Sequence, residues 1–182
     1  MEPLLTERLR IRTLRDEDAE PIERYASDFD VAKTTTNIPH PYPKGGGKQF
    51  VAQMKEKFEE GSILTFAIEN QDTMELIGLI SLRVSEQFQH AEIGYWIGKP
   101  FWNKGYGTEA VGAILDFGFN VLNLHKIFAS AFSTNPGSWR IMEKNGLTHE
   151  GTFKEHVYRW DEFHDLVFYG ILKKDYINRT RD

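Results

Sequence analysis

A short glycine-containing segment, residues 101–110 (FWNKGYGTEA), holds the residues whose types and spacing most directly suggest chemistry. It places Gly105 and Gly107 where an apolar, strand-like run gives way to a helical pattern. Glycine at such a junction lets the backbone approach a bound group, and free amides at the start of a helix bind anions such as phosphate. The spacing predicts a phosphate site here, with a tight turn that binds nothing as the plainer alternative.

Two common nucleotide-binding motifs fit the sequence poorly. Gly105-x-Gly107-x-x-Ala110 matches the dinucleotide fingerprint, which requires an acidic residue about 20 positions later, at the end of the next strand. Residues 123–132 (NLHKIFASAF) contain no acidic residue, and the motif follows antiparallel hairpins rather than the first strand of a parallel unit. A second glycine-rich run, residues 44–49 (KGGGKQ), lacks the leading Gly and the trailing Ser or Thr of a P-loop. The sequence therefore disfavours both classes.

The elements that must position this segment follow from hydrophobic periodicity. Residues 8–14 alternate Leu9, Ile11 and Thr13 against three arginines, which predicts a half-buried strand. Short polar breaks between three later apolar runs favour antiparallel hairpins. Further strands are expected at 63–70, 75–85, 90–98 and 126–132, with a last antiparallel pair joined near 160–163 and followed by a charged tail.

Helical patterns alternate with these strands. Helices are expected at 15–27, at 48–61, from the glycine segment to about residue 122, and at 135–146, while 34–48 is read as a loop. The last of these helices has legible ends, with Asn135 as N-cap, Pro136 at its first position and Gly146 just past its last turn. The long helix should bury one face, made of Ala110, Ala113, Ile114, Phe117 and Val121. No repeat or linker interrupts the order, which predicts one mixed α/β domain over residues 1–182.

Composition excludes several function classes. The chain has no cysteine, so disulfides, thiolate metal sites and a cysteine nucleophile are excluded, and a cytoplasmic location fits. The six histidines are scattered without helical pairing, so no metal is predicted. A net charge of −5 argues against nonspecific nucleic-acid binding. The charged N-terminus is not a secretory signal, and the sequence contains no run of roughly 18 apolar residues, so no membrane partner is expected.

Two longer segments narrow the alternatives. Residues 91–110 (AEIGYWIGKPFWNKGYGTEA) and 135–153 (NPGSWRIMEKNGLTHEGTF) resemble, in this order and spacing, the GNAT superfamily of acetyl-CoA-dependent N-acetyltransferases. The likeness is to the branch that acetylates the N-terminal alanine or serine of ribosomal proteins, and it extends from residue 6 to residue 176. It implies the acyl-CoA N-acyltransferase (GNAT) fold, a mostly antiparallel sheet with helices on both faces. Dimers are common in this family.

The resemblance implies a site for acetyl-CoA as co-substrate. In the family, the pyrophosphate lies on the backbone amides of the loop that enters the long helix. The residues that map to the cofactor site are Trp96, Ile97, Trp102, Asn103, Lys104, Gly105, Tyr106, Gly107, Thr108, Asn135 and Ser138. Trp102 departs from the family pattern, which has Arg or Gln at that position.

Acetyl transfer to an amine needs a base for the amine and a proton for the departing thiolate. Glu92 is the candidate base, since the resemblance places an acceptor on its strand near the incoming amine; the alternatives are a structural carboxylate and His90 as a weaker base. By the same resemblance Ser138 is the candidate proton donor, although a serine in a first helical turn also caps. Asn135 is either an N-cap or a ligand of the pantetheine arm. Tyr95 and Tyr106 are more typical of core aromatics than of acids.

The acceptor amine is left open at this point. A protein N-terminus follows from the branch, while a polyamine, an amino acid or an antibiotic amine remains an alternative. A further alternative is an acyl-CoA-binding sensor that has no catalytic activity. The loop at 34–47 and the C-terminal hairpin are expected to choose the acceptor, because the family varies most there.

Overall fold

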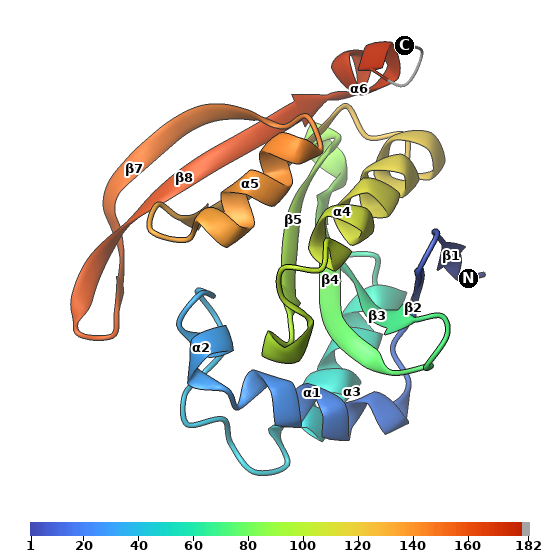
Figure 1. The fold of residues 1–182 in the computed structure, drawn as a ribbon. Helices are drawn as coiled ribbons and strands as arrows, with labels where there is room; N and C mark the ends of the chain where they lie inside the picture. Colours follow the sequence, from blue (N-terminus) through green and yellow to red (C-terminus); the bar gives the residue numbers. More distant parts are fainter. Residues whose placement is uncertain (180–182) are drawn as a thin grey trace.

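The computed structural model describes residues 1–179 of the chain. Its centre is one eight-stranded sheet with the strand order β1-β2-β3-β4-β5-β6-β8-β7 (Figure 1). Segments from both ends of the chain therefore belong to the same sheet. The strands are β1 (Leu4–Leu5), β2 (Leu9–Thr13), β3 (Ile63–Asn70), β4 (Leu76–Ser85), β5 (His90–Ile97), β6 (Lys126–Phe132), β7 (Thr148–Arg159) and β8 (Glu162–Leu172).

The sheet is antiparallel except where β5 meets β6. These two strands run parallel and pair only from His90 opposite Lys126 to Ile93 opposite Ala129. Beyond that point β5 continues to Ile97 in register with β4, while β6 continues to Phe132 in register with β8. The two strands therefore diverge, and among residues 1–179 no strand covers this edge of the second half of β5.

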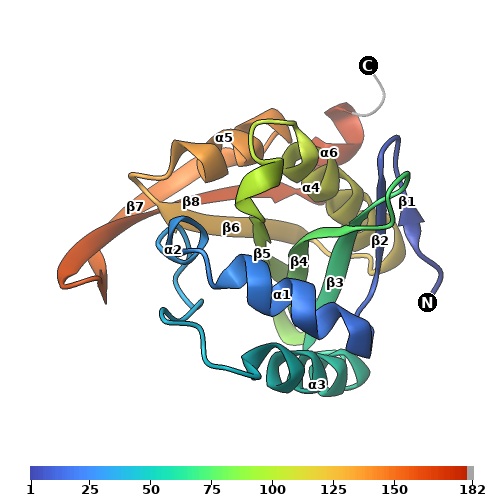
Figure 2. The ribbon, with the colours of Figure 1, turned by 60° about the horizontal axis from the view of Figure 1, so that its bottom comes forward.

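Helices cover both faces of the sheet. One face carries α1 (Ala19–Ala26) and α3 (Gly46–Glu59), and the other carries α4 (Tyr106–Asp116) and α5 (Pro136–Lys144) (Figure 2). Along β5 the side chains alternate, so that Glu92, Gly94 and Trp96 share the α1/α3 face while Tyr95 and Ile97 share the α4/α5 face. The remaining α-helices are α2 (Phe29–Ala32) and α6 (Lys173–Arg179), and a π-helical turn (Phe117–Val121) follows α4.

Two apolar clusters hold these layers together. The larger lies between the sheet and α4, where Phe66, Ile80, Ile114 and Ile127 are fully buried. A smaller cluster lies between the sheet and helices α1 and α3, and its buried members include Ile22, Val51, Met54 and Leu79. Within residues 1–179 no helix is long and apolar enough to cross a membrane.

The mixed α/β fold with helices on both faces confirms the sequence prediction, and most element boundaries agree within two residues. The final hairpin turns at Trp160 and Asp161, both with positive φ. The asparagine cap predicted for α5 is not made, because the Asn135 side chain does not bond to the first helical turn.

Arg12 contradicts the simple alternation predicted for β2. It is 6% exposed rather than solvated. Its guanidinium donates to both carboxylate oxygens of Asp18 at 2.8 Å and to Glu69 at 2.7 Å. The ion pairs compensate the burial of its charge, and a period-two pattern cannot reveal such partners because they lie elsewhere in the sequence.

Val121 was also assigned to the wrong surface. It is 66% exposed, whereas Phe119 is fully buried. The cause is the π-helical geometry of residues 117–121, which widens the turn and rotates the following side chains away from the 3.6-residue period. The charged tail predicted after the last strand begins with α6 at Lys173.

Candidate active site

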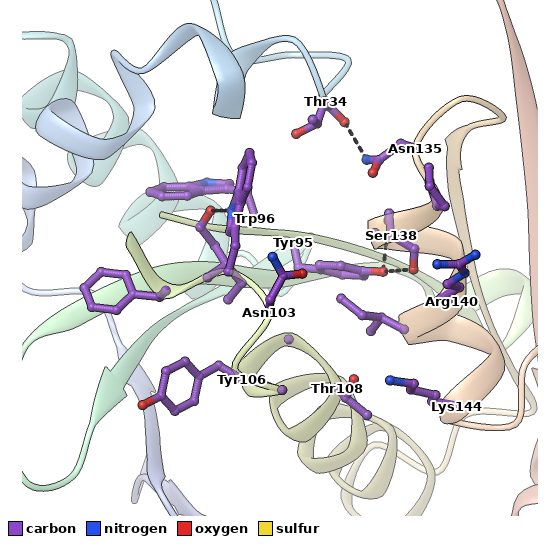
Figure 3. Close-up of a pocket in the computed structure, with 18 residues that line it drawn as sticks. Thr34, Tyr95, Trp96, Asn103, Tyr106, Thr108, Asn135, Ser138, Arg140 and Lys144 are labelled. Atoms are coloured by element: carbon purple, nitrogen blue, oxygen red, sulfur yellow. Dashed lines mark hydrogen bonds between the residues drawn. The ribbon is translucent and has the colours of Figure 1, made fainter. Parts of the chain in front are cut away.

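A cleft of about 450 Å³ opens on the α4/α5 face, beside the uncovered edge of β5 (Figure 3). It is bounded by the end of β5, the turn before α4, and α5. Its lining contains most of the cofactor-binding residues predicted from the sequence. The lining residues are Thr34, Tyr95, Trp96, Ile97, Phe101, Trp102, Asn103, Gly105, Tyr106, Gly107, Thr108, Asn135, Pro136, Gly137, Ser138, Arg140, Ile141 and Lys144.

The turn into α4 is shaped for an anion. Asn103 and Gly105 both have left-handed backbone conformations, with φ of 61° and 83°. Gly105 is the N-cap of α4 and offers no side chain to cap the first turn. The amides at the start of α4 therefore face the cleft together with the positive end of the helix dipole. These groups fit the pyrophosphate of a CoA thioester.

Gly107 has a packing role as well. A Cβ at this position would lie 2.7 Å from Cδ1 of Ile141, so a larger residue would require the Ile141 side chain on α5 to move. The two glycines thus differ: Gly105 provides the backbone conformation, while Gly107 permits the close contact between the helices that border the cleft.

The Trp102 side chain has a defined partner. Its indole Nε1 donates a hydrogen bond of 2.6 Å to the carbonyl of Ile97, the last residue of β5. The residue that departs from the common family pattern therefore ties the turn before α4 to the end of β5. We assign Trp102 to shaping the cleft rather than to supplying charge.

Arg8, from the N-terminal segment, braces the same turn. Its guanidinium donates to the Lys104 carbonyl at 2.9 Å and to Glu109 at 2.8 Å, and it lies 4.7 Å from the ring centroid of Tyr106. Burial opposes ionisation of Glu109, but hydrogen bonds from Thr6 and Arg8 outweigh it and lower the pKa of this carboxyl. Arg8 thus compensates the one acidic side chain in the first turn of α4.

Two cations that the sequence reasoning missed face the cleft from α5. Gly137, Arg140, Ile141 and Lys144 follow a helical stripe and all line the cleft (Figure 3). This three- and four-residue spacing was the available signal. Lys104, by contrast, does not line the cleft, and its ammonium lies 5.7 Å from the ring centroid of Phe101. Positive charge reaches the cleft mainly from α5.

Ser138 meets Tyr95 at the inner end of the cleft (Figure 3). The Tyr95 hydroxyl lies 3.0 Å from Oγ of Ser138 and donates to the Ser138 carbonyl at 2.9 Å. Burial raises the pKa of Tyr95, although the bond to Ser138 opposes the shift, so the phenol stays protonated at neutral pH. Two hydroxyl groups therefore adjoin one another, where the sequence indicated Ser138 as the proton donor and left a tyrosine as the alternative.

Asn135 turns its side chain toward the loop after α2. Its amide Nδ2 donates to the carbonyl of Thr34 at 3.4 Å (Figure 3). The contact brings the loop to the rim of the cleft, where both residues line the wall.

A second cavity, of about 480 Å³, lies on the α1/α3 face and contains Glu92. The Glu92 carboxylate accepts a hydrogen bond of 3.3 Å from Ser130 of β6. The floor of this cavity is the sheet and its walls are α1, α3 and the loop after α2. Its residues are Ile22, Ala26, Thr34, Thr35, Thr36, Asn37, Ile38, Pro39, Tyr42, Phe50, Met54, Lys57, Ile63, Thr65, Leu79, Ile80, Ser81, Arg83, Glu92, Ile93, Gly94, Tyr95, Trp96, Ser130, Ala131, Phe132 and Ser138.

The cavity and the cleft adjoin each other at the second half of β5. Thr34, Tyr95, Trp96 and Ser138 line both. This is the region where β5 and β6 have separated, so no ladder of backbone hydrogen bonds closes the sheet between the two spaces. Gly94 pairs with Ser81 without a bulge and keeps this part of the strand open toward the cavity.

His90, the weaker candidate base, lies outside both spaces. Its ring packs against Phe128 and Phe88, with centroid distances of 5.4 and 5.7 Å. Among residues 1–179 no group of three or more His, Cys, Asp or Glu side chains is arranged to hold a metal ion.

Comparison with known proteins identifies the family to which this chain belongs. Residues 8–148 match the family described as the acetyltransferase (GNAT) domain. The uncharacterized N-acetyltransferase p20 of Bacillus licheniformis is 30% identical over 177 residues, covering 97% of this chain and 99% of that protein. The [ribosomal protein uS5]-alanine N-acetyltransferase of Escherichia coli is 26% identical over 179 residues, covering 95% and 92%. The structure of spermidine N-acetyltransferase from Vibrio cholerae in complex with CoA and spermine matches with a TM-score of 0.84 at 23% identity, covering 95% of this chain and 100% of that one.

The chain belongs to the GNAT acetyltransferase family, and it is an N-acetyltransferase. Its relatives include the ribosomal-protein alanine acetyltransferases, in agreement with the branch identified from the sequence motifs.

Proposed function

We propose that the protein transfers the acetyl group of acetyl-CoA to the N-terminal amine of a protein, in a complex that holds both substrates at once. The observation that carries the proposal is the meeting of two spaces, one on each face of the sheet, at Tyr95, Trp96 and Ser138. The cleft fits the CoA thioester, and the cavity with Glu92 fits the amine.

The binding step follows from the cleft. The amides at the start of α4 receive the pyrophosphate, and Arg140 and Lys144 add positive charge for the phosphates. The pantetheine arm would then run toward the edge of β5, which no strand covers and whose backbone groups are available.

The chemical step uses groups from both sides. The neutral amine attacks the thioester carbonyl carbon, the nitrogen–carbon bond forms, and the carbon–sulfur bond breaks. Glu92, directly or through a water molecule, takes the proton that the amine loses. Tyr95 and Ser138 supply a hydroxyl proton to the sulfur as negative charge develops on it. Burial raises the pKa of Tyr95, so the phenol carries its proton at neutral pH and can donate a hydrogen bond to the sulfur.

The proposed acceptor rests on similarity to a characterised relative. The Escherichia coli relative acts on the alanine of ribosomal protein uS5, and that similarity extends over nearly the whole of this chain. We extend the proposal to one acetyltransferase domain over residues 1–182, since one sheet joins strands from both halves of the chain. We propose the cytoplasm as its location, in keeping with the absence of cysteine.

A small amine is the second candidate acceptor. It is supported by the Vibrio cholerae structure, which holds CoA and spermine and shares this fold. The two candidates differ in what the cavity must accommodate, either a peptide that leaves through the wall or a free polycation.

The test is an acetyl-CoA assay across N-terminal peptides and small amines, with thiol release and the mass of the acceptor measured together. The proposal expects stoichiometric thiol and acetylated peptide. Acetylation of small amines alone would reject the protein acceptor. Tight acetyl-CoA binding without transfer to any acceptor would favour the non-catalytic sensor.

A further inference from the structure

The cavity on the α1/α3 face has an unusual charge for a chain with a net charge of −5. Of the side chains that line it, Lys57 and Arg83 are cationic and Glu92 alone is acidic. The local balance is one positive charge in excess. The overall acidity of the chain, which suits a cationic substrate, does not extend to this cavity.

The two cations lack acidic partners. Within the part of the chain that the structure describes, neither Lys57 nor Arg83 forms an ion pair, although Lys55 on the same helix pairs with Asp16 at 2.9 Å. Glu92 accepts its hydrogen bond from Ser130 instead. The positive charge of Lys57 and Arg83 is therefore free to meet a ligand.

Strand register brings one of these cations beside the candidate base. Arg83 of β4 stands directly opposite Glu92 of β5, and directly opposite residues in an antiparallel pair point to the same face. Their Cβ atoms lie about 4.5–5.5 Å apart in such pairs. Lys57 reaches the same cavity from α3. An amine at Glu92 would thus have a cation within the length of one side chain.

We propose that the acceptor carries a carboxylate close to the amine that is acetylated, and that Arg83 and Lys57 bind it. This inference rests on the proposed function, since it assigns the amine to the cavity with Glu92. The carboxylate is either the α-carboxylate of a free amino acid or an acidic side chain near the N-terminus of a peptide. A polyamine, which carries several positive charges and no anion, is disfavoured by the same two side chains.

Matched acceptors test the proposal. One pair is free alanine and alaninamide, which differ in the α-carboxylate; because this carboxylate also raises the pKa of the amine, kcat/KM is compared per neutral amine. A second pair is Ser-Asp-Ala-Ala-amide and Ser-Asn-Ala-Ala-amide, which differ in the side-chain carboxylate, and spermidine is the polycationic comparison. We expect kcat/KM to favour the carboxylate member by about fivefold in at least one pair, in line with a partly exposed ion pair. The favoured pair identifies the source of the carboxylate.

Charge-neutral variants locate the effect. In Arg83→Gln and Lys57→Gln the preference should fall toward unity, through a rise in KM for the carboxylate member. The control Lys48→Gln removes a charge from the exposed side of α3, outside both spaces, and should keep the preference. Equal kcat/KM within both pairs, or a preference for spermidine, would overturn the inference.

Calorimetry separates this inference from the proposed function. Each acceptor is titrated into the CoA-loaded protein, so binding is measured without turnover. Tighter binding of the carboxylate members supports the inference even if no acceptor is acetylated, a result that would count against the proposed function alone. Indistinguishable binding within both pairs, together with indistinguishable rates, rejects it.

Discussion

The two faces of β5 carry proposed binding sites of different construction. On the α4/α5 face the proposed anion site consists of backbone amides after Gly105, whose geometry is set by a local turn. On the α1/α3 face the cavity is made of side chains from α1, α3, four strands, the loop after α2 and the start of α5. The first kind of site depends on residue spacing within ten residues. The second depends on which distant elements the fold brings together, and so it can change its ligand by single substitutions.

The largest expected effect comes from placing negative charge in the backbone site. Thr108 lines the cleft in the first turn of α4, where a carboxylate stabilises the free helix. We expect Thr108→Glu to fold normally and to lose acetyl-CoA affinity by about 100-fold or more, because like charges repel at close range. Calorimetry measures the affinity. Gln53→Glu on the exposed side of α3 adds the same charge and should bind acetyl-CoA as the parent does. Equal affinity of both variants for acetyl-CoA would show that the pyrophosphate does not bind at this turn.

The next effect concerns the other face. Glu92→Gln should lower turnover by roughly 100-fold at low pH, where the amine is protonated and needs a base. The loss should shrink as the pH approaches the pKa of the amine. Rate profiles of both proteins over pH measure this. A loss of the same size at every pH would reassign Glu92 to positioning.

The hydroxyl pair between the two faces should give a smaller effect. We expect Ser138→Ala to reduce kcat by about tenfold without a change in acetyl-CoA affinity, since a donor to the thiolate acts only as charge develops. Tyr95 adjoins Ser138 and substitutes for it in part. Tyr95→Phe and the double variant complete a cycle, in which the two losses should not add. Additive losses would show independent roles, and unchanged kcat with a lower melting temperature would leave Ser138 a purely structural role.

The smallest expected effect comes from Arg8, which supports the turn before α4. Arg8→Met removes the brace on the turn and the partner of Glu109, and it should weaken acetyl-CoA binding by about threefold, the size of a partly exposed ion pair. The pKa of Glu109 is lowered in the fold, so its contribution to stability is complete above the ordinary value of 4.5 and disappears as pH falls through the lowered pKa. The stability difference from the parent should therefore shrink in acid to the part supplied by the bond to the Lys104 carbonyl and the contact with Tyr106. Arg10→Met is the control, and a difference of the same size at every pH would contradict the ion pair.

The difference between the two faces also explains which parts of the candidate site could be predicted from the sequence. Gly105 and Gly107 could be predicted to form a phosphate site from local spacing, and the family resemblance added Thr108 to that prediction. The prediction of the cofactor site was incomplete where distant elements contribute to it. Arg8 precedes β2 and reaches the turn before α4 from there. Tyr95 meets Ser138 only because α5 packs on β5.

The acceptor side was harder still. Glu92 could be proposed from its strand, but its neighbours Arg83 and Lys57 were not recognised, since one is set by strand register and the other by the packing of α3. Val121 and Arg12 were misplaced for related reasons. A π-helical turn changes the helical period, and ion pairs formed across the fold override the alternation of a strand.

A crystal structure with acetyl-CoA tests the central claim, that one site spans both faces of β5, most directly. We predict the pyrophosphate on the amides after Gly105, and the thioester beside Ser138 and Tyr95 with its acetyl group directed toward the cavity that holds Glu92. A thioester bound outside the region where β5 and β6 diverge, or directed away from Glu92, would contradict the account.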